Sequence, residues 1–128
     1  DVYIICVPTP FRVEADGPVA DLSYVKQAAR GIAPHIKPGD IVILESTSPV
    51  GSTELVSGTL QDSGVDISQI SLAYCPERVL PGNILHELKH NDRAIGGIDE
   101  ESTSKAISFL FLSTPLLAQN DKTINKRK

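Results

Sequence analysis

The 128-residue sequence contains no methionine and only two cysteines. It therefore has no initiator residue, and an apolar run typical of a buried strand, residues 2–7, begins almost at once. We expect the chain to be a piece of a longer protein. The thiols Cys6 and Cys75 lie far apart and outside any CxxC pair. We expect both to be reduced, as in a cytoplasmic protein, and we expect no zinc or other metal site.

A net basic charge and long apolar runs are also missing. The formal net charge is −4, with 12 Lys and Arg against 16 Asp and Glu, so the chain lacks the basic footprint of a nucleic-acid-binding protein. No apolar run approaches the roughly 20 residues that a membrane span needs. The first residues carry no basic region of the kind that opens a signal peptide. We therefore expect neither nucleic acid nor a membrane among the partners.

Short apolar runs alternate with segments of helical periodicity. Strands are expected at residues 2–7, 41–44, 71–75, 94–98 and 115–118, and helices after Asp21, at 53–61, at 84–89 and after Asp99. This alternation predicts βαβ units of the α/β class, in a partial, Rossmann-like parallel sheet over residues 1–118. Residues 119–128 are expected to form a polar, basic, disordered tail.

Smaller features complete this reading of the chain. Residues 11–20 are expected to form a loop, and Asp21 and Ser52 to cap the helices that follow them. The pair Gly96-Gly97 is expected to allow a turn or a close approach of two backbones. Three histidines stand in polar surroundings and are expected to be exposed: His35, His86 and His90.

The most informative stretch is YCPERVLPG, residues 74–82. Pro76 has no amide hydrogen and ends the strand before it, so Glu77 and Arg78 stand just past the carboxyl end of that strand. Open α/β sheets bind their ligands at this edge. From these residues alone, Glu77 and Arg78 could also form a simple surface pair. Cys75 could act as a nucleophile, but no histidine flanks it, and a small buried side chain is the better interpretation.

Three loops are expected to converge at this edge: residues 7–10, 45–51 and 76–82. The second loop offers hydroxyl groups and backbone amides near the start of a helix, which can hold a phosphate or a polar cofactor edge. Taken singly, each loop is explained by turn and capping chemistry. Because the carboxyl ends of parallel strands lie at one edge, their convergence predicts a nucleotide or a nucleotide-linked ligand.

The sequence also resembles a known family. The motifs VPTPF (7–11), ESTSPVGST (45–53), YCPERVLPG (74–82) and NDR to GG (91–97) are similar, in order and spacing, to those of UDP-sugar 6-dehydrogenases. The resemblance covers roughly residues 1–113. Cys75 and Arg78 favour the UDP-N-acetyl-D-mannosamine branch, because the UDP-glucose branch carries Asn-Pro-Glu-Phe in the third motif.

The resemblance implies an NAD-dependent oxidation of a sugar 6-hydroxyl to a carboxylate, in two steps that pass through a cysteine thiohemiacetal and thioester. It implies that Thr9, Thr47 and Glu77 contact NAD, and that Thr47 and Glu77 serve catalysis. Glu77 would assist the attack of water on the thioester. The residues implied in binding the UDP-sugar are Arg78, Val79 and Leu80. The whole enzyme is expected to be a homo-oligomer.

Parts of the family pattern are missing from these 128 residues. They contain neither the Gly-rich dinucleotide fingerprint nor the catalytic Lys and Asn, and neither Cys6 nor Cys75 matches the Gly-rich segment of the nucleophile. From residue 116 onward the sequence departs from the family. We therefore expect the second part of an NAD-binding domain. The alternative is a catalytically inactive, truncated nucleotide-binding or structural fragment.

Overall fold

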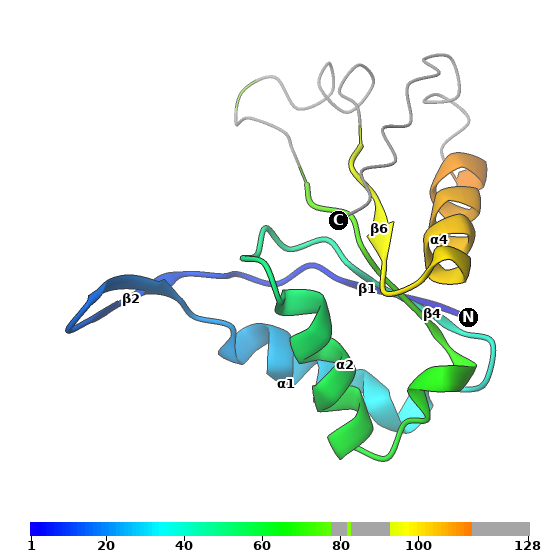
Figure 1. Cartoon of the computed structure of the whole chain (residues 1–128), viewed down its shortest axis with the longest axis horizontal. Helices are drawn as coiled ribbons and strands as arrows, with labels where there is room; N and C mark the ends of the chain where they lie inside the picture. Colours follow the sequence, from blue (N-terminus) through cyan, green and yellow to red (C-terminus); the bar gives the residue numbers. More distant parts are fainter. Residues whose placement is uncertain (78–81, 83–92, 114–128) are drawn as a thin grey trace.

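The computed structural model describes residues 1–77, 82 and 93–113 (Figure 1). The strands are β1 (Val2–Ile5), β2 (Phe11–Glu14), β3 (Gly17–Ala20), β4 (Ile41–Leu44), β5 (Ser71–Tyr74) and β6 (Gly96–Gly97). The helices are α1 (Ser23–Ile32), α2 (Ser52–Asp62) and α4 (Glu100–Ser113), with 3₁₀ turns at Ala33–His35 and Ile67–Gln69. The expected helix at 84–89, strand at 115–118, tail at 119–128 and two of the histidines lie outside the described residues; His35 is exposed, as predicted.

The main sheet has the strand order β1-β4-β5-β6. The pairs β1·β4 and β4·β5 are parallel, which confirms the predicted α/β, Rossmann-like class. The prediction of a wholly parallel sheet was wrong at β6, which runs antiparallel to β5. The reason is where the chain comes back to the sheet before β6. Arg93 lies beside Glu45 at the carboxyl edge, so the strand that follows Arg93 must run from the carboxyl edge toward the amino edge.

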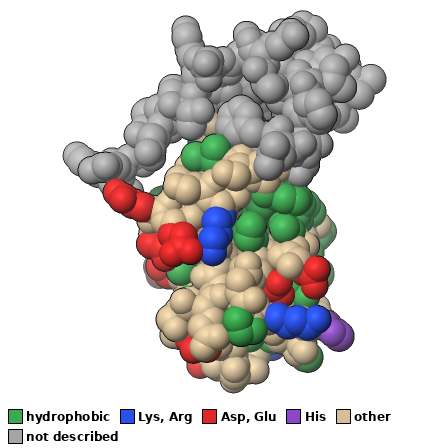
Figure 2. Space-filling view, turned by 90° about the vertical axis from the view of Figure 1, so that its right-hand side faces the viewer, with side chains coloured by type: hydrophobic (Ala, Val, Ile, Leu, Met, Phe, Trp, Pro, Cys, Tyr) green, Lys and Arg blue, Asp and Glu red, His purple; other side chains and the backbone are tan. Residues whose placement is uncertain are grey.

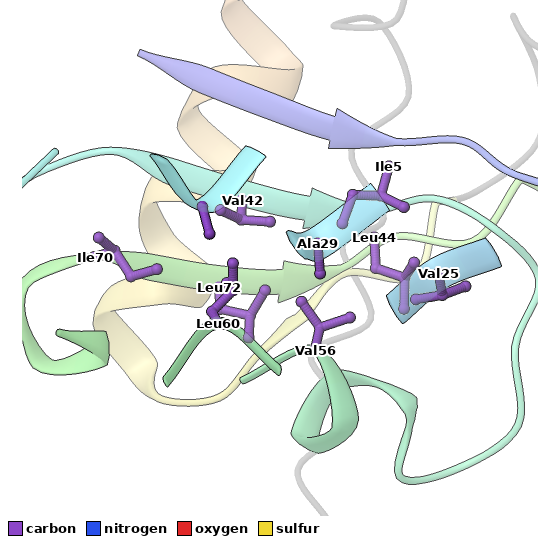
Figure 3. Packing of buried hydrophobic residues seen from close by; sticks show 10 residues of the cluster. Ile5, Val25, Ala29, Val42, Leu44, Val56, Leu60, Ile70 and Leu72 are labelled. Atoms are coloured by element: carbon purple, nitrogen blue, oxygen red, sulfur yellow. The ribbon is translucent and has the colours of Figure 1, made fainter. Parts of the chain in front are cut away.

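Helices α1 and α2 cover one face of the sheet (Figures 1 and 3). Val25 and Ala29 of α1 are fully buried against alternate residues of the strands, and the helical spacing seen in the sequence is the spacing of this buried stripe. Residues that form this core are Ile5, Val25, Ala29, Ala33, Val42, Leu44, Val56, Leu60, Ile70 and Leu72. Burial of this apolar surface supplies the main stabilisation of the layer.

Helix α4 covers only part of the opposite face. Ala106 and Leu110 pack against Ile43, Ala73 and Cys75, which β4 and β5 direct to that side. The register places Ile4 on this face as well, yet its side chain is 45% exposed. Figure 2, which views the molecule from the right-hand side of Figure 1, shows a group of hydrophobic side chains at the surface. The sheet is therefore fully covered on one face and partly covered on the other.

Residues 11–20 form a β-hairpin, so the prediction of a loop was wrong. β2 pairs with β3 from Phe11↔Ala20 to Glu14↔Gly17, and Gly17 takes a φ of +118° after the turn. All four residues of β2 are exposed, so the hairpin rests on local backbone pairing and leaves no buried periodicity in the sequence. Figure 1 shows the hairpin extending away from the sheet.

The two predicted helix caps are displaced by one residue. Asp21 lies one residue before the N-cap of α1, but its Oδ1 still accepts a hydrogen bond from the Ser23 amide at 2.9 Å. Ser52 is the first residue of α2, and Gly51 is the N-cap; the Ser52 hydroxyl donates to the Pro49 carbonyl at 2.7 Å. No helix within the described ranges is long and apolar enough to cross a membrane.

The two adjacent glycines of β6 play different roles. A methyl group on Gly97 would lie 2.6 Å from Cβ of Ser102 and would also meet the backbone nitrogen of Thr103, whereas Gly96 has open space around it. Ser102 is itself buried, and its hydroxyl accepts a hydrogen bond from the Leu72 amide at 3.2 Å. The predicted close backbone approach is therefore confirmed for Gly97, which admits the first turn of α4 against the sheet.

We predict that Gly97→Ala destabilises the chain by about 1–3 kcal/mol, because the new methyl group must displace the backbone of α4. Gly96→Ala is the matched control and should change stability by less than about 0.5 kcal/mol. Urea unfolding followed by circular dichroism measures both. Equal midpoints for the two variants would contradict the packing seen at Gly97.

Candidate functional site

The three strand-end loops lie side by side at the carboxyl edge of the sheet. The Thr9 hydroxyl donates a hydrogen bond to the Thr47 carbonyl at 2.6 Å, which joins the loop after β1 to the loop after β4. The Glu77 amide donates to the Glu45 carbonyl at 3.1 Å, which joins the loop after β5 to the same middle loop. The convergence expected from parallel strands is therefore present in the structure.

Ser46 ties the first two loops together from within. Its side chain is buried, and its hydroxyl accepts a hydrogen bond from the Val7 amide at 2.8 Å while lying 3.4 Å from the Ile5 carbonyl. The sequence analysis did not single out this residue. Ser46 lies two residues after Leu44, the last residue of β4. Because side chains of a strand alternate between the two faces, this spacing predicts that Ser46 points to the same buried face as Leu44.

Tyr74 holds the middle loop from the other side. Its hydroxyl accepts a hydrogen bond from the Ser48 amide at 3.1 Å and donates one to the Ser48 carbonyl at 3.2 Å. Both polar backbone groups of Ser48 are thus satisfied by one side chain of β5. This contact also escaped the sequence analysis, because nothing in the local sequence pairs residue 74 with residue 48.

Of the residues predicted for the site, the structure describes the three predicted to contact NAD. Thr47 and Glu77 are exposed at the edge, and Thr9 is half-buried beside Thr47. The three residues predicted to contact the sugar, Arg78, Val79 and Leu80, lie outside the described residues. The structure therefore places the predicted cofactor side chains at one edge and leaves the sugar contacts undescribed.

Cys6, Glu45 and Cys75 form a row on the α4 face. The strand residues just before them, Ile5, Leu44 and Tyr74, are in register across the sheet. The three side chains therefore lie next to one another at the ends of β1, β4 and β5. The Cys6 thiol donates to Oε2 of Glu45 at 3.3 Å, and Nη1 of Arg93 donates to Oε1 at 3.4 Å. One carboxylate therefore accepts from both a thiol and a guanidinium.

These surroundings keep both thiols protonated at neutral pH. Partial burial, together with the Glu45 and Glu77 carboxylates, raises the pKa of Cys6 to about 11. Burial also raises the pKa of Cys75, against the opposing effect of the Arg93 guanidinium. Both cysteines are free, and Cys75 is only 1% exposed, which agrees with its interpretation as a small buried side chain. A nucleophile needs the thiolate, so neither residue is suited to that task.

A cleft of about 680 Å³ opens beside the middle loop. It lies between the start of α2 and the β6–α4 connection, and its walls include Ser48, Val50, Tyr74, Ile95, Asp99 and Ile107. Thr9, Thr47 and Glu77 do not line it. Across the part of the chain that is described, no cluster of three His, Cys, Asp or Glu residues is placed to hold a metal ion.

A parallel sheet whose carboxyl edge gathers hydroxyl groups, backbone amides and a carboxylate is the architecture of a dinucleotide-binding domain. Residues 1–114 match the domain described as "UDP-glucose/GDP-mannose dehydrogenase family, NAD binding domain". The chain belongs to this family of dehydrogenases, and the relationship and the cofactor class expected from its motifs are confirmed.

Individual relatives agree with this assignment. The UDP-N-acetyl-D-mannosamine dehydrogenase of Salmonella typhimurium is 42% identical over 96% of this chain and 31% of that protein. An NDP-N-acetyl-D-galactosaminuronic acid dehydrogenase of Ralstonia nicotianae is 49% identical over 83% of this chain and 26% of that protein. Among solved structures, the UDP-D-ManNAc dehydrogenase of Pyrococcus horikoshii superposes with a TM-score of 0.72 at 41% identity, over 84% of this chain and 25% of that one. The chain spans less than a third of the length of each.

We predict that Cys6 titrates near pH 11, because partial burial and the Glu45 carboxylate raise its pKa. Glu45→Gln should lower this pKa, because the substitution removes the neighbouring negative charge and leaves the burial in place. The measurement is the pH dependence of iodoacetamide alkylation, read by mass spectrometry on the peptide that contains Cys6. Glu54→Gln, an exposed position on α2, is the control and should leave the profile unchanged. A midpoint near 9 in the unaltered chain would contradict the arrangement of Cys6 beside Glu45.

Proposed function

We propose that this chain is part of the NAD-binding domain of an NAD-dependent UDP-N-acetyl-D-mannosamine 6-dehydrogenase. The whole enzyme would oxidise the sugar 6-hydroxyl to the carboxylate in two steps. The observation that carries the proposal is the meeting of the three family motifs at one sheet edge, through Thr9, Thr47, Glu45 and Glu77. The identity of 42% to a relative of that name supports the choice of sugar.

The proposed roles follow from the positions of the side chains. Thr9 and Thr47 would contact NAD, since their loops are joined and present hydroxyl and amide groups at the edge. NAD, when bound, accepts the hydride in each oxidation. Glu77 would take a proton from the water that attacks the thioester, a task that requires a carboxylate held at a fixed position. Its amide is fixed by Glu45.

The nucleophilic cysteine of the reaction would come from outside these 128 residues. Cys6 is held protonated beside Glu45, and Cys75 is buried under α4. The side chains proposed to contact the UDP-sugar, Arg78, Val79 and Leu80, follow directly after Glu77 in the sequence.

The wider biological setting is also part of the proposal. We place the enzyme in the cytoplasm, as a homo-oligomer that supplies an N-acetylated uronate for polysaccharide biosynthesis. The relative from Ralstonia nicotianae is named for an N-acetyl-D-galactosaminuronic acid, so the N-acetylated sugar class is supported more broadly than the manno configuration. The alternative is that the chain is a catalytically inactive, truncated nucleotide-binding or structural fragment.

We predict that the 128-residue chain alone forms no NADH from NAD and UDP-N-acetylmannosamine, because it contains neither the Gly-rich turn that receives the pyrophosphate nor the family's nucleophile. NADH absorbance measures turnover, and calorimetry measures NAD affinity, which should be weak or undetectable. Turnover above the blank, or micromolar NAD binding, would show that the segments missing from this sequence are not required.

We predict that Glu77→Gln in the intact enzyme impairs the second half-reaction, with a loss of about 10²–10⁴-fold in steady turnover, because glutamine cannot take a proton from water. A burst of NADH from the first oxidation should survive, and intact-mass measurements should find a sugar thioester on the enzyme. Glu14→Gln on the exposed hairpin is the matched control. If the burst disappears together with turnover, Glu77 does not have the proposed role.

A further inference from the structure

We propose that Tyr74 is a positioning residue for the cofactor, whose hydroxyl holds the peptide group between Thr47 and Ser48 and thereby sets where Thr47 meets NAD. The inference rests on the proposed function, in which Thr47 contacts NAD and Tyr74 has no role. It concerns the binding of NAD and starts from the way in which one peptide group is held by two side chains.

The peptide group between Thr47 and Ser48 is held at both of its polar atoms. The Thr47 carbonyl accepts the Thr9 hydroxyl at 2.6 Å, and the Ser48 amide donates to the Tyr74 hydroxyl at 3.1 Å. Thr9 follows β1 and Tyr74 ends β5, so the two partners come from the strands on either side of β4. Because a peptide group is planar, holding its oxygen and its nitrogen fixes its orientation, and with it the direction of the Thr47 side chain.

Both neighbours of Thr47 are anchored as well. The Tyr74 hydroxyl also donates to the Ser48 carbonyl at 3.2 Å, since a phenol can donate one hydrogen bond and accept another. On the other side, the buried Ser46 accepts from the Val7 amide at 2.8 Å, and its carbonyl accepts the Ser48 hydroxyl at 2.9 Å. Thr47 is therefore an exposed residue between two fixed ones.

The position of Tyr74 is itself set by the sheet. Its backbone is in register with Leu44 of β4 on one side and with Gly96 of β6 on the other. From this fixed backbone the side chain reaches Ser48, which lies 26 positions earlier in the chain. The contact is made by the tyrosine side chain, so a substitution that deletes only the hydroxyl removes it directly.

Loss of the hydroxyl should free the middle loop on the side that faces the cleft. Ser48 and Tyr74 both line this cleft of about 680 Å³, next to the fully exposed Val50, so a released loop has room to move. When only a fraction of the molecules holds the arrangement that binds a ligand, the apparent dissociation constant rises by the inverse of that fraction. We therefore expect Tyr74 to affect the affinity for NAD.

Tyr74 acts through Thr47 in this account, and this distinguishes a positioning role from two others. A purely structural tyrosine would lower stability without selecting one ligand. A tyrosine that contacted NAD directly would add its effect to that of Thr47, so its loss would weaken binding whatever residue stood at position 47.

The test uses the intact enzyme and measures NAD affinity by calorimetry, together with the Michaelis constants. Tyr74→Phe should raise the dissociation constant for NAD by about 10-fold, the factor expected if the binding arrangement falls to about a tenth of the population. Turnover at saturating NAD and the Michaelis constant for the UDP-sugar should change by less than about 2-fold. In a Thr47→Val background, Tyr74→Phe should cause no further loss, because the hydroxyl that it positions is already absent.

Tyr3→Phe is the matched control. The Tyr3 hydroxyl also bonds to the backbone, but it donates to the His35 carbonyl, at 2.9 Å, in a 3₁₀ turn and not in a loop of the site edge. Both tyrosine variants should lower the melting temperature by a similar, small amount, and Tyr3→Phe should leave NAD affinity unchanged.

Three results would overturn the inference while leaving the proposed function intact: unchanged NAD affinity in Tyr74→Phe, an equal loss in Tyr3→Phe, or a further loss of the same size in the Thr47→Val background. If Thr47→Val alone leaves NAD affinity unchanged, the proposed contact of Thr47 with NAD is wrong, and this inference with it. An unaltered enzyme that binds NAD but does not oxidise the UDP-sugar would overturn the proposed reaction, and the NAD measurements would still decide the role of Tyr74.

Discussion

The parallel register of β1, β4 and β5 is the constraint on which the remaining features depend. It aligns Ile5, Leu44 and Tyr74 across the sheet, so the next residue of each chain segment emerges at the same height. Two consequences follow from this alignment. The loops that bear the family motifs start side by side, and the row of Cys6, Glu45 and Cys75 forms on one face. Neither result requires any attraction between the loops themselves, because backbone hydrogen bonds have already set their spacing.

The site edge is then held by bonds between loops that are far apart in the sequence. Thr9 binds the Thr47 carbonyl, the Ser46 hydroxyl accepts from Val7, and the Tyr74 hydroxyl satisfies Ser48. Each of these bonds gives a partner to a backbone polar group that would otherwise have to bind water at the end of a strand. A ligand that binds here meets groups whose directions are already fixed, which lowers the entropy lost on binding. Glu45 extends the same principle from hydroxyl groups to a charged pair.

The two faces of the sheet are covered unequally. On one face, α1 and α2 bury a continuous apolar core, while on the other α4 lies close to β5 and β6 and leaves Ile4 exposed. Gly97 is the reason that α4 can lie so close, because its missing side chain admits the first turn of the helix. The thiol of Cys75 is enclosed under this helix, which removes it from the chemistry of the adjoining edge.

The sequence by itself determined the class of fold, the main strands and the set of loops that form the site. Buried parallel strands such as 41–44 are apolar throughout, and breakers such as Pro76 mark where they end, so both signals are local. Only the tertiary structure decided that β6 runs antiparallel, that residues 11–20 pair as a hairpin, and that Glu45 receives Cys6 and Arg93. The physical reason is that these features depend on where distant backbone segments return in space. A residue's local pattern records its burial and its turn preference, but not which partner the sheet brings beside it.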